Sequence, residues 1–152
     1  MVTTQRFHDV LPHEPLFEVT PHHCAFSVPD LESSIVWYRD MLGFTLEMRM
    51  IVSEFPMTIA MLQRRNFRIE LFEVPGAKPL PDNRRDLDDD LRTHGTKHLA
   101  LNVRDVRAAL AALKDRRVDV ARDVFEIDNV AACFIRDNAG NLIELIQWPS
   151  PE

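Results

Sequence analysis

Two hydrophobic periodicities follow one another in the first half of the chain. Residues 22–28 alternate between apolar and small or polar side chains, which is typical of a half-buried strand. Apolar residues then recur at spacings of four, three and four, which predicts one face of a helix: Leu31, Ile35, Tyr38 and Leu42. Asp30 suits the position before such a helix, and Gly43 suits the left-handed residue that ends it. Strand-like runs follow near 44–52, 57–64 and 67–73.

The second half of the chain repeats this order. It predicts a strand at 98–103, a cap at Asp105, a helix with Val106, Leu110 and Leu113 inward, and strands near 118–125, 130–136 and 142–148. The halves align in register, so that His23 falls on His98 and Glu70 falls on Glu144. Each half therefore reads strand, helix, strand, strand, strand, as expected of a duplicated unit.

The repeat divides the chain into segments. We predict an α+β fold with two βαβββ modules, at residues 22–74 and 97–149. Residues 75–96 are rich in proline and charge and are predicted to be a solvated connector, while residues 1–21 form an N-terminal arm with no clear period. The acidic run Asp86–Asp90 favours a solvated face over a metal site.

Composition narrows the class of protein. The chain has 152 residues, 45% hydrophobic and 28% charged, which is typical of one globular domain. No run of 18 apolar residues or secretory signal is visible, so neither a membrane span nor export is expected. A net charge of −6 disfavours a nucleic-acid partner. Cys24 and Cys133 cannot form a disulfide scaffold, and we expect reduced thiols in a cytoplasmic protein.

Four polar residues inside predicted strands are candidate metal ligands. Alternation turns the apolar neighbours toward the helices, and His23, Glu70, His98 and Glu144 toward the opposite face of the sheet. Two imidazoles and two carboxylates suit a divalent zinc, nickel, iron, cobalt or manganese ion with positions left for substrate. Taken singly, a strand histidine is more often packed and a glutamate more often ion-paired, but their repetition in register favours a metal site. His22 is the alternative to His23 as ligand.

The motifs resemble a known family. Three segments are similar to motifs of the vicinal oxygen chelate superfamily, which includes glyoxalases, bleomycin-resistance proteins and dioxygenases. They are H-H-C-A-F-S-V-P-D-L-E-S-S-I-V-W-Y-R-D-M-L-G-F, K-H-L-A-L-N-V-R-D-V and D-N-A-G-N-L-I-E-L. The resemblance implies that the two modules form a cupped eight-stranded mixed sheet with the helices outside, around a divalent metal. By position, it implies His23, Glu70, His98 and Glu144 as the ligands.

The ligand pattern is similar to that of glyoxalase I. It implies a metal-dependent lyase or isomerase that acts on a small oxygen-chelating substrate through an enediolate-type intermediate, with Glu70 or Glu144 as the catalytic base. The alternatives are an extradiol-type dioxygenase, in which Glu70 would be idle, and a non-catalytic resistance protein that binds a small molecule. Modules in this family pair within one chain or between two, and we expect a homodimer.

Overall fold

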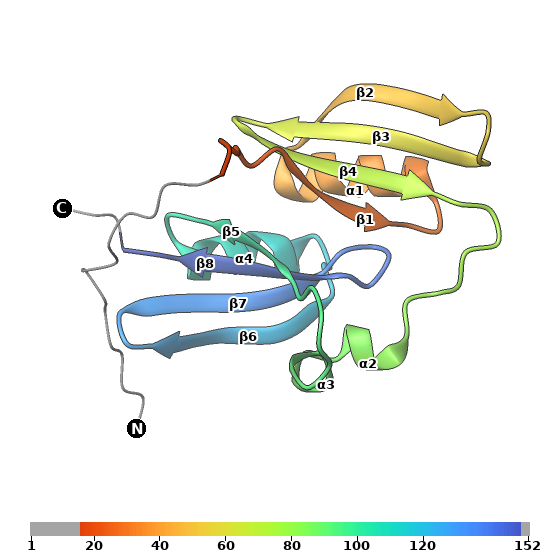
Figure 1. Cartoon of the computed structure of the whole chain (residues 1–152). Coiled ribbons are helices and arrows are strands. Elements are labelled where there is room, and N and C mark those ends of the chain that lie inside the picture. The colour runs from red at the N-terminus through yellow and green to blue at the C-terminus, as the bar shows by residue number, and fades with distance from the viewer. Residues whose placement is uncertain (1–15, 150–152) are drawn as a thin grey trace.

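The two halves of the chain adopt the same order of elements (Figure 1). The computed structural model describes residues 16–149, so most of the predicted N-terminal arm lies outside the described residues. The first module comprises β1 (His23–Ser27), α1 (Leu31–Leu42), β2 (Thr45–Val52), β3 (Met57–Arg64) and β4 (Phe67–Glu73). The second comprises β5 (Leu99–Asn102), α4 (Val106–Asp115), β6 (Val120–Ile127), β7 (Val130–Arg136) and β8 (Leu142–Gln147).

Both long helices begin at the predicted caps. The Asp30 carboxylate accepts a hydrogen bond from the backbone N–H of Ser33 at 2.6 Å. Hydrogen bonding by the Ser33 side chain, and secondly by its backbone N–H, holds the pKa of Asp30 below its usual range. Asp105 accepts from the N–H of Ala108 at 2.9 Å. Gly43 ends α1 with a φ of 69°, a conformation in which other residues are strained. The caps read from the sequence are therefore confirmed.

The strands form two mixed sheets of four. Their orders are β1-β4-β3-β2 and β5-β8-β7-β6, with one parallel pair in each, β1 with β4 and β5 with β8. The two βαβββ modules are thus confirmed. The eight strands are divided between two sheets, and no strand ladder joins the sheets within residues 16–149. In Figure 1 the edge strands β1 and β5 face each other across the junction between the modules.

One hydrophobic core runs through both modules. It includes Tyr38 and Leu42 of α1 and Val106 and Leu110 of α4, and each helix covers one face of its own sheet. Burial and the adjacent Asp137 carboxylate raise the pKa of Tyr38 well above its usual range. The protonated Tyr38 hydroxyl donates to Asp137 at 2.9 Å and thereby ties the first module to the second.

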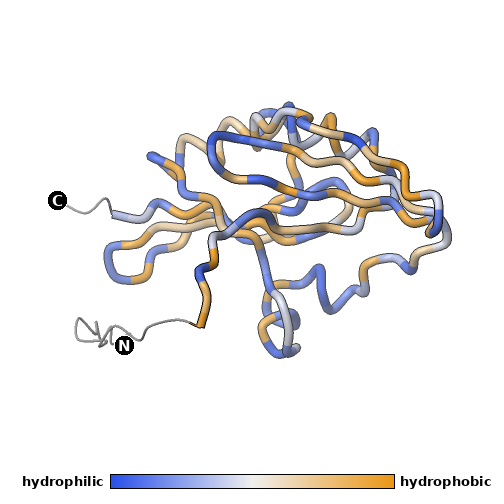
Figure 2. The backbone as a smooth tube through the Cα atoms, turned by 45° about the horizontal axis from the view of Figure 1, so that its top comes forward, coloured by the Kyte–Doolittle hydropathy of each residue, from blue (hydrophilic) through white to orange (hydrophobic). Residues whose placement is uncertain are grey.

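The linker is more ordered than a solvated connector. It contains two short helices, α2 (Asp82–Arg85) and α3 (Leu87–Leu91), although its backbone is largely hydrophilic in Figure 2. Leu87 is buried against Phe134 and Leu142 of the second sheet. Asp90 is 1% exposed and lies 2.9 Å from the Arg84 guanidinium. The two linker helices are too short to be stable alone, and the burial of Leu87 and of the paired Asp90 carboxylate stabilises them.

None of the helices within the described part of the chain is long and apolar enough to cross a membrane.

Candidate functional site

The first module brings one predicted histidine to one predicted glutamate. His23 opens β1, and Glu70 lies in the middle of β4, where the parallel register sets it opposite Ala25. Ile69 and Leu71 are fully buried toward α1, so Glu70 points to the opposite face of the sheet. His23 Nε2 lies 3.4 Å from Glu70 Oε2, and the two side chains are 33% and 22% exposed.

The second module repeats this geometry. His98 immediately precedes β5, and Glu144 lies in β8 between the buried residues Ile143 and Leu145. His98 Nε2 lies 3.3 Å from Glu144 Oε2, and these side chains are 22% and 15% exposed. In both modules the glutamate lies between two buried strand residues, and the histidine lies beside it.

The two histidines have different neighbours on their second ring nitrogen. His22 Nδ1 lies 2.7 Å from His23 Nδ1, so one ring donates a hydrogen bond to the other and the Nε2 of His23 is turned toward Glu70. His98 instead rests edge-on against Phe134, with ring centroids 4.9 Å apart. Its Nδ1 is buried and has no hydrogen-bond partner among the residues that the structure describes. His22 is therefore hydrogen-bonded to His23, and the choice between them as ligand stays a prediction.

The structure brings the four residues together in pairs. Within residues 16–149, no group of three or more histidine, cysteine, aspartate or glutamate side chains is close enough to hold one ion. Each module thus presents one imidazole and one carboxylate, and a single chain presents two separate pairs. A site with all four ligands would need one pair to be brought next to the other.

Each pair taken alone fits a divalent metal. Two ligand atoms about 2.0–2.1 Å from a tetrahedral zinc ion are about 3.4 Å apart. The observed separations of 3.4 Å and 3.3 Å match this spacing. Neutral imidazole and carboxylate are ligands of zinc and of the neighbouring divalent metals, and two carboxylates would balance the charge of the ion. The donor set is therefore compatible with the implied cofactor.

Other reactive side chains are held inactive. Burial raises the thiol pKa of both Cys24 and Cys133 to about 11, so neither is a thiolate nucleophile near neutral pH. Arg68 lies on the face that carries Glu70, and its guanidinium is 2.6 Å from the Glu47 carboxylate. The hydrogen bond from Arg68 lowers the pKa of Glu47. Neither cysteine nor Arg68 is therefore a competing reactive group beside the His–Glu pairs.

Around Glu70 the first sheet presents an apolar surface. Met48 and Met50 of β2 face Met61 and Ile59 of β3 across the sheet, and both β2 methionines remain 44% exposed. Methionine adapts its shape and is frequent on binding surfaces. The corresponding face of the second sheet carries the stacked rings of Phe125 and Phe134, partly covered by the linker.

Comparison with known proteins agrees with the duplicated fold. Residues 20–145 match the Glyoxalase/Bleomycin resistance protein/Dioxygenase superfamily, and the chain belongs to that superfamily. None of the curated proteins matches the chain. The resemblance found in the sequence motifs is therefore confirmed at the level of the superfamily.

Several solved structures share the fold. A glyoxalase family protein from Enterococcus faecalis is 19% identical with a TM-score of 0.71, covering 84% of this chain and 97% of its own. Glyoxalase I from Zea mays is 24% identical with a TM-score of 0.67, and the match covers 85% of this chain and 44% of the maize chain. The trypanothione-dependent glyoxalase I of Leishmania major is 23% identical with a TM-score of 0.64, covering 86% and 87% of the two chains. Identities this low show a shared fold.

Proposed function

We propose that the chain is a divalent-metal-dependent lyase or isomerase of the glyoxalase type. Its substrate is a small molecule with two adjacent oxygen atoms, such as the hemithioacetal of an α-ketoaldehyde. The observation that carries the proposal is the repeated His–Glu pair, with separations of 3.4 Å and 3.3 Å at matching positions of the two modules. Shape alone does not require a histidine and a glutamate at the same two strand positions twice.

His23, Glu70, His98 and Glu144 would hold the metal. When bound, a divalent ion would polarise a substrate carbonyl and lower the pKa of the neighbouring C–H. A carboxylate would then accept the carbon-bound proton to give an enediolate, and the same carboxyl would return that proton to the adjacent carbon while the hydroxyl proton moves from the first oxygen to the second. The product is an isomer of the substrate, and no oxidant or reductant is consumed. We assign Glu70 as the base because it is the more exposed of the two carboxylates, 22% against 15%, and so the more accessible to substrate.

The complete ligand set would form between two copies of the chain. Support comes from the separation of the two pairs within residues 16–149 and from the exposed methionines beside Glu70. In such a homodimer each site takes His23 and Glu70 from one copy and His98 and Glu144 from the other.

Elemental analysis of protein purified without added metal tests the metal centre directly. The expected result is about one divalent ion per chain, lost in His23→Ala and in His98→Ala, because each removes one ligand. His94→Ala is the matched control, since His94 is an exposed linker histidine that belongs to neither His–Glu pair. Undiminished metal in both ligand variants would overturn the proposal.

Mixing the two ligand variants tests the shared site. Homodimers of His23→Ala or of His98→Ala lack a complete site, but a mixed dimer contains one site with both histidines intact. After subunit exchange, metal capacity should recover to roughly a quarter of the wild-type value. A site built within one chain gives no recovery, and a monomer in gel filtration that still binds metal would equally exclude the shared site.

Glu70→Gln tests the base. Hemithioacetal isomerisation should fall by about 10²–10⁴-fold while metal remains bound, because the amide cannot accept the proton. Full turnover in this variant would contradict the assignment and favour a chemistry in which Glu70 is idle.

A further inference from the structure

His22 and His23 form a ring-to-ring contact that the second module lacks. The Nδ1 atoms of the two residues lie 2.7 Å apart, and the ring centroids are 5.0 Å apart. These two separations differ by about the width of one imidazole ring, so both nitrogens lie close to the line that joins the ring centres. The hydrogen bond is therefore nearly straight and lies in the plane of each ring, where a ring nitrogen donates and accepts best.

The two ring nitrogens of His23 face different partners. Nε2 lies 3.4 Å from the Glu70 carboxylate, on the side of the proposed metal centre, and Nδ1 faces His22. A neutral imidazole that binds a metal through Nε2 carries its one proton on Nδ1. In that state His23 Nδ1 donates and His22 Nδ1 accepts. Within residues 16–149, His22 is the only hydrogen-bond partner of His23 Nδ1.

No neighbour on the adjacent strand can replace His22 as this acceptor. Arg68 lies directly across from His23 on β4, but a guanidinium only donates hydrogen bonds. Two of its nitrogens are directed at the Glu47 carboxylate, at 2.6 Å and 2.9 Å, so this carboxylate is already engaged. The acceptor behind His23 is therefore specific to His22.

The repeat places Lys97 where the first module has His22. The Lys97 ammonium donates instead to the backbone carbonyls of Asp90 and Thr93 in the linker. His98 Nδ1 is buried and has no hydrogen-bond partner in the described part of the chain. The paired histidines are therefore not required by the βαβββ fold, because the second module forms the same strand without them.

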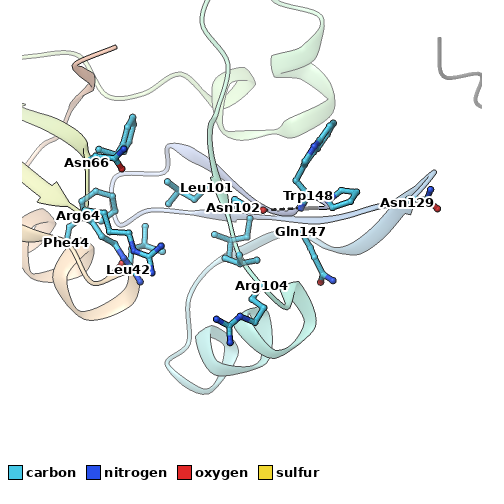
Figure 3. Close-up of a pocket in the computed structure, with 15 residues that line it drawn as sticks. Leu42, Phe44, Arg64, Asn66, Leu101, Asn102, Arg104, Asn129, Gln147 and Trp148 are labelled. Atoms are coloured by element: carbon cyan, nitrogen blue, oxygen red, sulfur yellow. Dashed lines mark hydrogen bonds between the residues drawn. The ribbon is translucent and has the colours of Figure 1, made fainter. Parts of the chain in front are cut away.

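The large cavity between the modules is separate from this contact (Figure 3). It has a volume of about 1090 Å³ and is open and basic, with Arg64, Arg65 and Arg104 in its wall and no histidine among its lining residues. In Figure 3, Arg104 and Trp148 lie on opposite sides of the strands, so these two side chains do not converge on one ligand. A substitution of His22 does not alter the wall of this cavity.

We propose that His22 is a positioning residue for the metal ligand His23. The Nδ1 of His22 accepts the hydrogen bond from His23 Nδ1 and thereby turns His23 Nε2 toward the ion. An acceptor behind a ligating histidine fixes its tautomer and ring orientation and raises its basicity. The inference rests on the proposed metal centre and adds a role for His22, which orients the ligand while His23 binds the metal.

Zinc affinity of the full chain tests this role. Titration with Zn²⁺ against a chromophoric chelator measures the affinity without any substrate. His22→Phe keeps an aromatic ring but removes the acceptor, so the affinity should fall by about 10–100-fold. His22→Asn should restore most of the affinity, because the asparagine Oδ1 is the same number of bonds from the backbone as the histidine Nδ1 and can accept the same hydrogen bond.

His94→Phe is the matched control. It makes the same substitution at an exposed histidine that belongs to neither His–Glu pair, and the zinc affinity should not change. Circular dichroism verifies that each variant is folded.

Two results would overturn the role of His22 and leave the metal centre in place. One is a His22→Phe variant that binds zinc as tightly as the wild type. The other is an equal loss of affinity in His22→Phe and His22→Asn, because His22 would then be a ligand itself or a residue needed only for structure. A wild-type chain that binds no zinc, or a His23→Ala variant that binds it undiminished, would overturn the proposed function and this inference together.

Discussion

The two modules hold the same His–Glu pair in different surroundings. In the first, His23 is supported by the neighbouring ring of His22, and the methionines beside Glu70 remain open to solvent. In the second, His98 is packed against Phe134, and the linker leucine Leu87 covers part of the same face. The position of a residue in the strand thus fixes which face it occupies, while neighbours on the adjacent strands fix how exposed it is.

The residue directly across the sheet from each glutamate shows this difference most clearly. Glu70 faces Met61 of β3, whereas Glu144 faces Phe134 of β7. Both neighbours are buried, 7% and 6% exposed. Methionine is flexible and fills irregular space, while the phenylalanine ring makes fixed contacts with His98 and Phe125. We therefore expect the second pair to be the more rigid of the two.

The largest loss of folding stability is expected when the residue opposite each glutamate is replaced by alanine. Phe134→Ala should lower the free energy of unfolding by about 3–5 kcal/mol, and Met61→Ala by about 2–4 kcal/mol, since the ring leaves the larger cavity. Urea denaturation measures both. An equal or larger loss for Met61→Ala would contradict the view that the second pair rests on the firmer support.

A smaller effect is expected where the modules are tied together. Tyr38→Phe keeps the buried ring but removes its hydrogen bond to Asp137, which should cost about 1–2 kcal/mol in the free energy of unfolding. Tyr38 is the only tyrosine of the chain, so its ultraviolet absorbance also reports ionisation: the raised pKa predicts no titration of the folded phenol around pH 10–11.

Ser33→Ala provides the control for this junction. It removes an exposed hydroxyl that accepts from Asn138 at 3.2 Å, and its effect should stay below about 0.5 kcal/mol. A tyrosine that titrates normally, or a Tyr38→Phe variant as stable as the parent, would show that the bond to Asp137 does not hold the modules together.

The smallest expected effect on stability comes from the ionisation of one thiol in each module. Burial raises the pKa of Cys24 and of Cys133 from 9.0 to about 11. Because the folded-state pKa is the higher one, the contribution of each thiol to stability is complete below about pH 9 and is lost as the pH rises toward 11. Alkylation by iodoacetamide should accordingly be slow near pH 8 and accelerate up to about pH 11.

Comparison of the two thiols sharpens the contrast between modules. Cys24 is half-buried and Cys133 fully buried, so Cys24 should react first. Mass spectrometry of peptides from partly alkylated protein gives the order. Rapid modification of either thiol near pH 8 would be inconsistent with the burial described here.

Much of each module could be predicted because its determinants are local. A period of two fixes the face of His23 and Glu70, and aspartates before helices fix where α1 and α4 begin. The linker could not be predicted in this way. Its helices contain four and five residues, and they depend on the burial of Leu87 against Phe134, a contact between residues 47 positions apart.

The sequence by itself determined the duplicated βαβββ units and the two repeated pairs of imidazole and carboxylate. Tertiary structure decided how the units sit together: two separate sheets, a buried bond from Tyr38 to Asp137, and an open basic cavity at one junction. The physical reason is the range of the interactions. Backbone periodicity and capping act within a few residues, whereas the packing of modules depends on surfaces that exist only after both modules have folded.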